Sequence, residues 1–331
     1  MRIERLNPVG EPADLTAITP VTREFFAEVY PGFPPPGENR MRFWASDGYH
    51  TRNPTYAVYP DEPDSAPLAL LGLGLQDDGN LDLVNAFLVL PVARRDDGTG
   101  AFLLREALRL AAEHGRSRLV IDAASTTDPT PFFTAAGGRH VFTGTRSVLD
   151  LTEVDPGKYE AWAAGSAKNA GYRFVRWVDR CPDELAESYC TAMDAMRDAP
   201  LEDMKFEHPK ADLERLRGRE EHSAGYGIRR HVLAAVDAEG NVAGFNIFAA
   251  TPDEPQSIDI WDTAVIGEHR GHGLGLRIKA AATLWMREEY PQARWVETFN
   301  NHGNEHMLNV NLTMGYRKYE NWLAFEFATG A

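Results

Sequence analysis

Residues 257–289 read SIDIWDTAVIGEHRGHGLGLRIKAAATLWMREE, and this stretch decides the fold. The run 257–266 is strand-like, whereas residues 276–290 carry apolar side chains at helical spacing. Glycines occupy positions 271, 273 and 275 between them. The pattern predicts a strand that passes through a glycine-rich loop directly into a long helix.

Such a loop suits a ligand that carries phosphate. The N-terminus of a helix exposes unpaired backbone N–H groups and the positive end of its dipole, and glycines let a ligand approach the backbone closely. Arg270, just before the glycines, is expected to add charge-assisted hydrogen bonds to phosphate oxygens. A nucleotide-tailed cofactor is therefore the predicted occupant, and a glycine-rich turn without a ligand is the alternative.

Two other phosphate motifs are excluded by their spacing. The glycines form G-x-G-x-G rather than the G-x-G-x-x-G of dinucleotide-binding folds. The pattern G-x-x-x-x-G-K-[ST] of P-loop NTPases does not occur in the sequence. Neither a dinucleotide-binding fold nor a P-loop NTPase is therefore expected.

Both halves of the chain repeat one order of strands, loop and helix. A shift of about 175 residues superposes the loops and indicates an internal duplication. The superposed pairs are Arg95 with Arg270, Gly98 with Gly273, and Gly100 with Gly275.

The length of 331 residues and the alternation of strands with amphipathic helices predict two α/β domains. Each is expected to be a mostly antiparallel mixed sheet (α+β) flanked by helices. The expected ranges are 1–152 and 168–331, with the boundary in the turn-rich segment 152–168. The segment 140–151 is expected to be the last strand of the first domain.

The sequence resembles the GNAT superfamily of N-acetyltransferases in this loop and in the segment that follows it. The family's phosphate loop is [QR]-x-x-G-x-[GA] after a strand with an upstream valine, and the matching residues are Val265, Arg270, Gly273 and Gly275. The family often continues with Asn, a small residue or Met, and then Gly-Phe or Gly-Tyr. The matching residues there are Asn304, Met307, Asn311, Gly315 and Tyr316. The resemblance covers residues 170–328 strongly and residues 1–150 more weakly.

The resemblance implies a tandem-domain N-acetyltransferase that uses acetyl-CoA, similar in layout to mycothiol synthase and antibiotic-modifying acetyltransferases. In this family a splayed strand pairs with the pantetheine arm and polarises the thioester carbonyl. The implied arm-binding residues are Thr263, Ala264, Val265, Asn304 and Asn311. The implied pyrophosphate-binding residues are Arg270, Gly271, His272, Gly273, Leu274, Gly275 and Leu276. Asn304 is equally suited to cap the helix that it opens.

Acetylation of an amine needs a base that takes its proton. Asp259 lies where several relatives carry a glutamate base, and Asp262 is the alternative, which is also suited to a structural role. In a regularly alternating strand the two would point to opposite faces, so that only one faces the substrate. Glu297 in the next strand is a third candidate.

The acid is less defined than the base. Many relatives place a tyrosine four residues before the glycine of the Gly-Phe pair, where this chain has Asn311. An asparagine cannot donate a proton in this way, so Tyr316 or solvent is expected to protonate the departing thiolate. Packing at the start of a strand is the alternative role for Tyr316.

The first half is predicted to be a degenerate domain that braces the active one. It keeps Arg95, Gly98 and Gly100 but places Asp96 and Asp97 within the loop, where carboxylates repel a pyrophosphate. A second, weaker acetyl-CoA site is the alternative.

Charge, cysteine content and the length of apolar runs limit which partners and which cellular location are expected. The formal net charge of -15 argues against binding to nucleic acid, which requires clustered Lys and Arg. Cys181 and Cys190 match no metal or redox motif, and no metal is expected. No apolar run is long enough for a membrane span, and residues 1–15 lack the core of a signal peptide, so a cytoplasmic protein is expected.

The predicted substrate is the amine of a small molecule, either a metabolite or an antibiotic. A peptide or protein amine and a non-catalytic acyl-CoA-binding or regulatory module are the competing interpretations. The sequence does not fix the oligomeric state, and a homodimer is left open.

Overall fold

The computed structural model describes residues 1–198 and 200–330, which form two compact units. Unit 1 comprises Met1–Thr143, Leu201–Glu207 and Glu320–Ala331. Unit 2 comprises Gly144–Pro200 and His208–Tyr319. Each unit is therefore built from more than one stretch of the sequence. The bounds of these stretches differ from the expected ranges 1–152 and 168–331.

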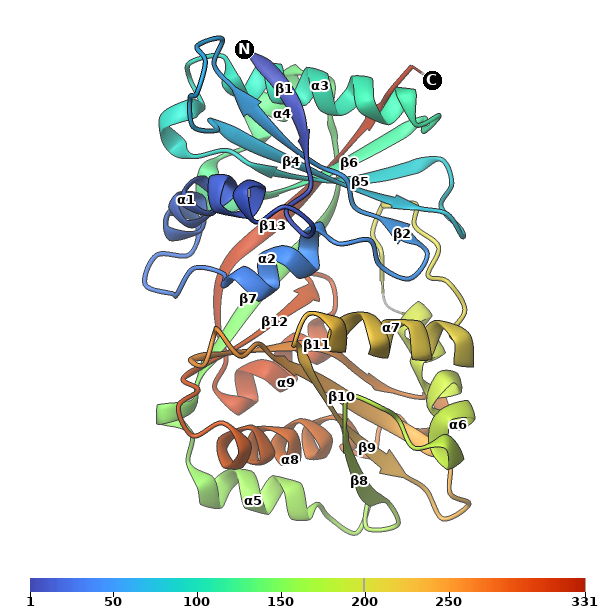
Figure 1. The fold of residues 1–331 in the computed structure, drawn as a ribbon. Helices are drawn as coiled ribbons and strands as arrows, with labels where there is room; N and C mark the ends of the chain where they lie inside the picture. The colour runs from blue at the N-terminus through green and yellow to red at the C-terminus, as the bar shows by residue number, and fades with distance from the viewer. Residues whose placement is uncertain (199, 331) are drawn as a thin grey trace. The chain divides into compact units, whose positions relative to one another are not determined.

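Unit 1 contains a mixed sheet with the strand order β1-β3-β4-β5-β6-β13 (Figure 1). Its strands are β1 (Arg2–Leu6), β3 (Thr55–Tyr59), β4 (Ala69–Gln76), β5 (Leu83–Val89), β6 (Arg118–Ala124) and β13 (Arg317–Ala328). Neighbouring strands are antiparallel except β5 and β6, which are parallel. The short β2 (Thr51–Arg52) pairs with β4.

Helices cover both faces of this sheet because its strands alternate buried side chains between two cores. Leu71 packs with α3 (Thr99–Glu113) and with Phe133 of α4 (Thr130–Ala135). Its neighbour Leu70 packs with α1 (Pro12–Val29) and with Met41 of α2 (Glu38–Ala45). This alternation is the period of two expected of a strand that is buried on both faces.

Unit 2 repeats the arrangement with the order β8-β9-β10-β11-β12-β7. Its strands are β8 (Arg173–Val178), β9 (Arg229–Val236), β10 (Val242–Ala250), β11 (Ser257–Val265), β12 (Trp295–Asn301) and β7 (Arg139–Asp150). Only β11 and β12 are parallel neighbours. The mixed, mostly antiparallel sheets flanked by helices confirm the predicted fold class.

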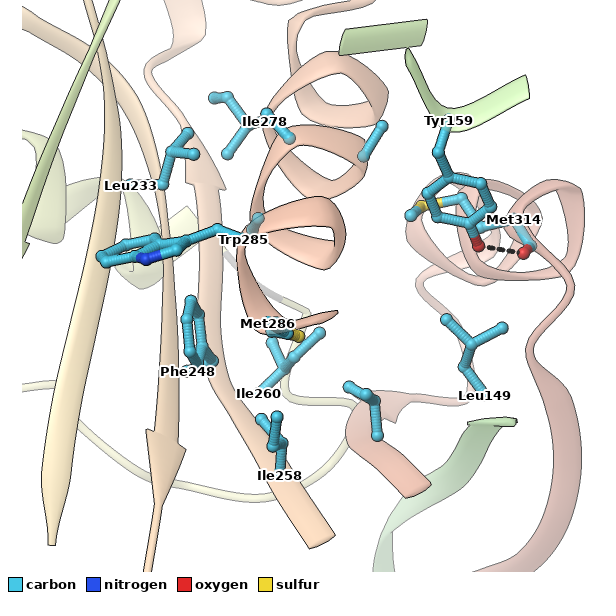
Figure 2. Close-up of a cluster of buried hydrophobic side chains, with 14 of the residues drawn as sticks. Leu149, Tyr159, Leu233, Phe248, Ile258, Ile260, Ile278, Trp285, Met286 and Met314 are labelled. Atoms are coloured by element: carbon cyan, nitrogen blue, oxygen red, sulfur yellow. Dashed lines mark hydrogen bonds between the residues drawn. The ribbon is translucent and has the colours of Figure 1, made fainter. Parts of the chain in front are cut away.

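One face of the unit 2 sheet packs on α8 (Leu274–Glu289), α5 (Pro156–Ala164) and α9 (Glu305–Met314). In Figure 2, Trp285 and Met286 of α8 lie beside Phe248, and the rings of Phe248 and Trp285 are 5.2 Å apart. The other face packs on α6 (Asp183–Met193) and α7 (Leu213–Gly225). We call these the α8 face and the α6/α7 face.

The prediction that residues 140–151 close the first domain is wrong for their second part. Residues 144–150 of β7 pair with β12 and belong to unit 2. The corresponding position in unit 1 is taken by β13 from the C-terminal end of the chain, which pairs with β6 from Trp322 to Ala328. Two strands can form backbone hydrogen bonds however far apart they are in the sequence. The order of elements along the chain therefore does not show which sheet the last strand of a domain joins.

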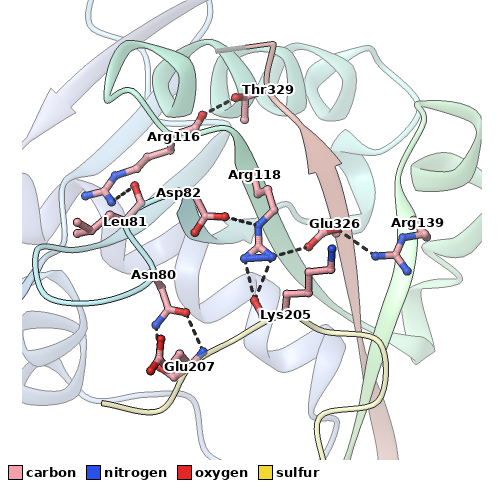
Figure 3. Close-up of polar contacts among 10 residues, drawn as sticks. All are labelled: Asn80, Leu81, Asp82, Arg116, Arg118, Arg139, Lys205, Glu207, Glu326 and Thr329. Atoms are coloured by element: carbon pink, nitrogen blue, oxygen red, sulfur yellow. Dashed lines mark hydrogen bonds and ion pairs between the residues drawn. The ribbon is translucent and has the colours of Figure 1, made fainter. Parts of the chain in front are cut away.

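The segment 201–207 also belongs to unit 1, although its neighbours in the chain belong to unit 2. Asn80 forms two hydrogen bonds of 2.8 Å with the backbone of Glu207, one in each direction (Figure 3). The Arg118 guanidinium donates to the Lys205 carbonyl at 2.7 and 3.0 Å and also pairs with Glu326. These contacts fix a connection that otherwise has no helix or strand of its own.

Within the part of the chain that the structure describes, no helix combines the length and the apolar character needed to cross a bilayer.

Candidate functional site

The glycine-rich loop forms the turn from β11 into α8. Gly271 and Gly273 have φ angles of 81° and 71°, values that residues with a Cβ adopt only with strain, and Gly273 is the residue that caps α8. The first backbone hydrogen bond of the helix runs from Arg277 N–H to the Gly273 carbonyl. Among the described residues, no hydrogen-bond acceptor faces the backbone N–H groups of residues 271–276. The turn therefore presents a row of unsatisfied donors at the positive end of the α8 dipole.

The segment before β8 holds this turn in place. Asn169 is buried and donates from Nδ2 to the His272 carbonyl at 3.0 Å. The Tyr172 hydroxyl lies 2.8 Å from Nδ1 of His269. Arg277 of α8 donates to the carbonyls of Ala163, Asn169 and Tyr172. The loop is thus fixed by residues that the sequence pattern assigned to a linker or did not single out.

A bulge changes the course of β11 just before the loop. Ile247 of β10 faces Asp262, whereas the next residue, Phe248, faces Ile260, so Trp261 is the extra residue. The parallel pairing of β11 with β12 ends at Ile260, opposite Thr298. Residues 262–265 therefore pair with β10 on one side only, as the resemblance implied for a strand that splays at a bulge.

The side chains at the end of β11 are packed rather than mobile. Thr263 Oγ1 accepts a hydrogen bond of 2.7 Å from Asn246, a fully buried residue of β10. A Cβ on Gly244 would lie 2.8 Å from the Ala264 carbonyl oxygen, so β10 must carry a glycine here. Ala264 and Val265 can therefore offer backbone groups, but not movable side chains, to a ligand.

Arg270 does not lie over the free N–H groups of the loop. Its Nε donates to the Val265 carbonyl at 2.9 Å, and its guanidinium pairs with Asp198 at 2.7 Å. The side chain thus fastens the end of β11 to the turn. Both partners are largely exposed, so a phosphate group can compete with Asp198 for the guanidinium.

The two candidate bases lie on the same face of the sheet, which corrects the expectation that they point to opposite faces. Asp262 faces Ile247 and Asp259 faces Ala249, and these two β10 residues are two positions apart. Facing residues of antiparallel strands share a face, and residues two apart on one strand do as well. The extra residue Trp261 shifts the alternation of β11 by one position, so both aspartates lie on the α6/α7 face.

Asp262 is half-buried among charged side chains. Desolvation raises the pKa of its carboxyl, and Arg230, Arg219 and His208 oppose the rise. A carboxylate with a raised pKa is a stronger base than an exposed one, and nearby arginines favour its ionised form. Asp262 therefore has the electrostatic surroundings of a general base.

Glu297, the third candidate, is held by an arginine. It lies opposite Asp259 in the β11–β12 pair and accepts a 2.6 Å hydrogen bond from Nε of the buried Arg146. A carboxylate engaged in a charge-assisted hydrogen bond of this kind is less available to a substrate. Its place in the structure is that of an ion-pair partner.

The predicted residues of α9 lie near the end of β12. Asn304 caps α9 by accepting a 3.2 Å hydrogen bond from Met307 N–H, which is the alternative role expected for it. Asn311 is buried and donates to Asn300 at 2.7 Å, while its Oδ1 is buried without a hydrogen-bond partner among the described residues.

Tyr316 lies in the core of unit 2. It is 2% exposed, and its buried hydroxyl has no hydrogen-bond partner among the described residues. Burial raises the pKa of this hydroxyl well above its usual value, so it stays protonated at neutral pH. Nζ of Lys279, a buried residue of α8, lies 5.0 Å from the centre of the Tyr316 ring. The surroundings of Tyr316 are those of a packing residue in the core of unit 2.

The loop of unit 1 has a similar backbone, but a carboxylate of the chain itself bonds one of its N–H groups. Gly98 has a φ of 89° and caps α3, as Gly273 caps α8. However, Asp97 Oδ1 accepts a 2.9 Å hydrogen bond from Thr99 N–H, and this bonding lowers the pKa of Asp97. The chain's own carboxylate therefore takes the position in which an external anion would bind.

Sequence analysis missed a group of charged and polar residues around the site: Asn169, Tyr189, Arg219, Arg230 and Lys279. Lys279 carried a readable signal, because residues 275, 278, 282 and 286 place it beside the apolar stripe of a helix. The others carried none, since they lie on α6, α7, β9 and the segment before β8, which come together only in the folded unit.

Comparison with known proteins agrees with this geometry. Residues 193–311 match the model of the acetyltransferase (GNAT) family. A tandem GNAT protein from the clavulanic acid biosynthesis pathway, solved without acetyl-CoA, is 25% identical with a TM-score of 0.82. The alignment covers 100% of this chain and 99% of that one.

More distant structures share the fold. A GCN5-related N-acetyltransferase from Sphaerobacter thermophilus is 14% identical with a TM-score of 0.70, over 99% of this chain and 95% of that one. A GNAT-family acetyltransferase from Colwellia psychrerythraea is 11% identical with a TM-score of 0.57, over 99% and 100%. No curated protein matches the sequence.

Proposed function

We propose that the chain is a tandem-domain GNAT acetyltransferase in which unit 2 transfers an acetyl group from acetyl-CoA to the amine of a small molecule. The observation that carries this proposal is the row of free N–H groups at residues 271–276, opened by glycines and placed beside the unpaired edge of β11. We propose a cytoplasmic location, which fits two buried free cysteines.

The residues present fit coenzyme A. The N–H groups of residues 271–276 would bind the pyrophosphate, and Arg270 would exchange Asp198 for a phosphate oxygen. The one-sided backbone of Thr263 to Val265 would pair with the pantetheine arm. Asn311, through its free Oδ1, would contact the same arm. Acetyl-CoA supplies the acetyl group as an activated thioester.

The chemistry proposed is direct transfer. Asp262 takes a proton from the acceptor amine, the nitrogen forms a bond to the acetyl carbon, and the carbon–sulfur bond breaks. Coenzyme A leaves as a thiolate, and Tyr316 or solvent returns a proton to it. Asp259, on the same face of the sheet, is the alternative base.

Unit 1 is proposed to bind no acetyl-CoA. Asp97 already satisfies the first N–H group of α3, and a second carboxylate, Asp96, is next to it. An anion would have to displace a bonded carboxylate at the cost of like-charge repulsion. We therefore propose residues 168–331 as the active domain and residues 1–152 as the degenerate domain.

Replacement of Asp262 by Asn tests the mechanism. Removing a general base costs about 10²–10⁴-fold in turnover. We expect D262N to release free thiol from acetyl-CoA at least about 100-fold more slowly over a panel of small amines, with unchanged acetyl-CoA affinity. In the wild type, the acid limb of the rate profile should lie above the usual pKa of an aspartate, because burial raises the pKa of Asp262.

The control is E239Q, which removes an exposed carboxylate from the turn between β9 and β10. It should leave turnover unchanged. If D259N abolishes turnover and D262N does not, the base is Asp259. Acetyl-CoA binding without thiol release from any amine would favour the non-catalytic acyl-CoA-binding module.

A further inference from the structure

Two arginines near Asp262 make no hydrogen bond or ion pair through their side chains within residues 1–198 and 200–330. Arg230 of β9 is only 4% exposed, and Arg219 reaches the surface of α7. Other charged groups of α7 are engaged, since Arg217 pairs with Glu220 and Asp183. Burying a charged side chain without a partner is costly, so the burial of Arg230 needs an explanation.

The strand register places Arg230 on the same face as the candidate bases. Arg230 faces Ala249, and Ala249 in turn faces Asp259. One row further along, Val232 faces Ile247, which faces Asp262. Ala249 has no side chain beyond Cβ, so no long β10 side chain separates Arg230 from Asp259 on the α6/α7 face.

Both arginines act electrostatically on Asp262. Arg230 and Arg219 each favour the ionised form of Asp262, and desolvation lowers the pKa of Arg219. Tyr189 of α6 belongs to the same group, because Arg230 and Asp262 both act on the pKa of its hydroxyl. That hydroxyl is completely buried and has no hydrogen-bond partner among the described residues.

The charges of this group do not balance. Burial lowers the pKa of His208, which favours the neutral form of this side chain. Arg219 and Arg230 both act on the carboxylate of Asp262, and neither has a side-chain ion pair among the described residues. A singly charged anion beside them would offset part of this positive charge.

We infer that Arg230 and Arg219 form a subsite for a carboxylate group of the acceptor, so that the substrate is a small amino acid-like molecule with its amine beside Asp262. The inference deepens the proposed function and rests on it. Arginine binds a carboxylate with two parallel hydrogen bonds, which would fix the orientation of the acceptor. The Tyr189 hydroxyl supplies a further hydrogen bond to the same ligand.

The test uses matched pairs of amines with the full-length protein and acetyl-CoA. Each pair contains an amino acid and its carboxamide: the common α-amino acids, β-alanine and γ-aminobutyrate. We expect at least one pair in which the acid has a kcat/KM about tenfold or more above that of the amide, since a site built for a charged group discriminates against its neutral analogue. In R230M and R219M this ratio should fall to near one.

The matched control is R176M. Arg176 lies on β8, and its guanidinium sits 5.2 Å from the Trp285 ring on the α8 face. This variant should keep the preference for the acid. If R230M does not fold, R219M carries the test, because its side chain is exposed. Amides that react as well as the acids, or a preference that survives in both arginine variants, would overturn the inference.

A binding measurement separates this inference from the proposed function. N-acetyl amino acids and their amides are titrated calorimetrically into the protein with coenzyme A present. Tighter binding of the acids that is lost in R230M supports the carboxylate subsite even if no amine is ever acetylated. Equal binding of acids and amides contradicts it, whether or not turnover occurs.

Discussion

Lys279 is a buried titratable side chain that lowers the stability of unit 2 near neutral pH. Its side chain is 1% exposed, and desolvation lowers the pKa of its ammonium group to about 7. In the unfolded chain this pKa returns to its ordinary value near 10.5. As the pH falls from about 10.5 to 7, the unfolded chain takes up a proton that the folded chain does not, so the lysine destabilises the fold increasingly.

The variant K279M should therefore be more stable than the wild type at pH 7. We expect a gain of about 1–4 kcal/mol in the free energy of unfolding, because methionine fills a similar volume without a charge. The gain should shrink towards pH 10 and stay constant below pH 7. Urea unfolding of both proteins across this range measures it, and a K279M that is less stable than the wild type at pH 7 would contradict this account.

At the scale of elements, the segment 201–207 depends on a few contacts from unit 1. Asn80 has a φ of 45° and bonds the backbone of Glu207 in both directions. The variant N80G removes both bonds and tolerates the positive φ better than alanine would. Amide hydrogen exchange at Glu207 should become about 5–10-fold faster, as expected for the loss of about 1 kcal/mol.

The control for N80G is D64G. Asp64 also has a positive φ, 56°, in a turn of unit 1. Its replacement should leave the exchange of Glu207 unchanged. Equal exchange rates at Glu207 in N80G and wild type would mean that the Arg118 contacts alone hold the segment.

The predictable part of the fold is local. The glycine turn at 270–275, its strand and its helix follow from spacing, and so does the repeat at 95–100. The bulge at Trp261 does not, because a strand with an extra residue has the same composition as a regular one. For this reason the sequence placed Asp259 and Asp262 on opposite faces, whereas they share one. Arg219 and Arg230 were missed because three strands and a helix must assemble before they approach Asp262.

At the scale of the whole molecule, the duplicated halves have kept one backbone and diverged in chemistry. The mixed sheet, with its one parallel pair of strands, occurs in both units. The loops also share a left-handed glycine at the helix start, Gly98 or Gly273. They differ because Asp97 bonds the first amide of α3, while the corresponding amides of α8 are free. β7 precedes residue 152 in the sequence but pairs with β12 of unit 2. Cutting the chain near residue 152 would therefore separate these two paired strands.

The most direct measurement of the central claim is a calorimetric titration of the full chain with acetyl-CoA in wild type, G273V and G98V. Both glycines have a positive φ, and a Cβ added to either would meet no atom within 3.5 Å, so the two replacements impose a similar backbone strain. We predict one site per chain in the wild type, its loss in G273V, and its retention in G98V. Binding that persists in G273V, or that disappears in G98V while G273V still binds, would contradict the assignment of the coenzyme A site to unit 2.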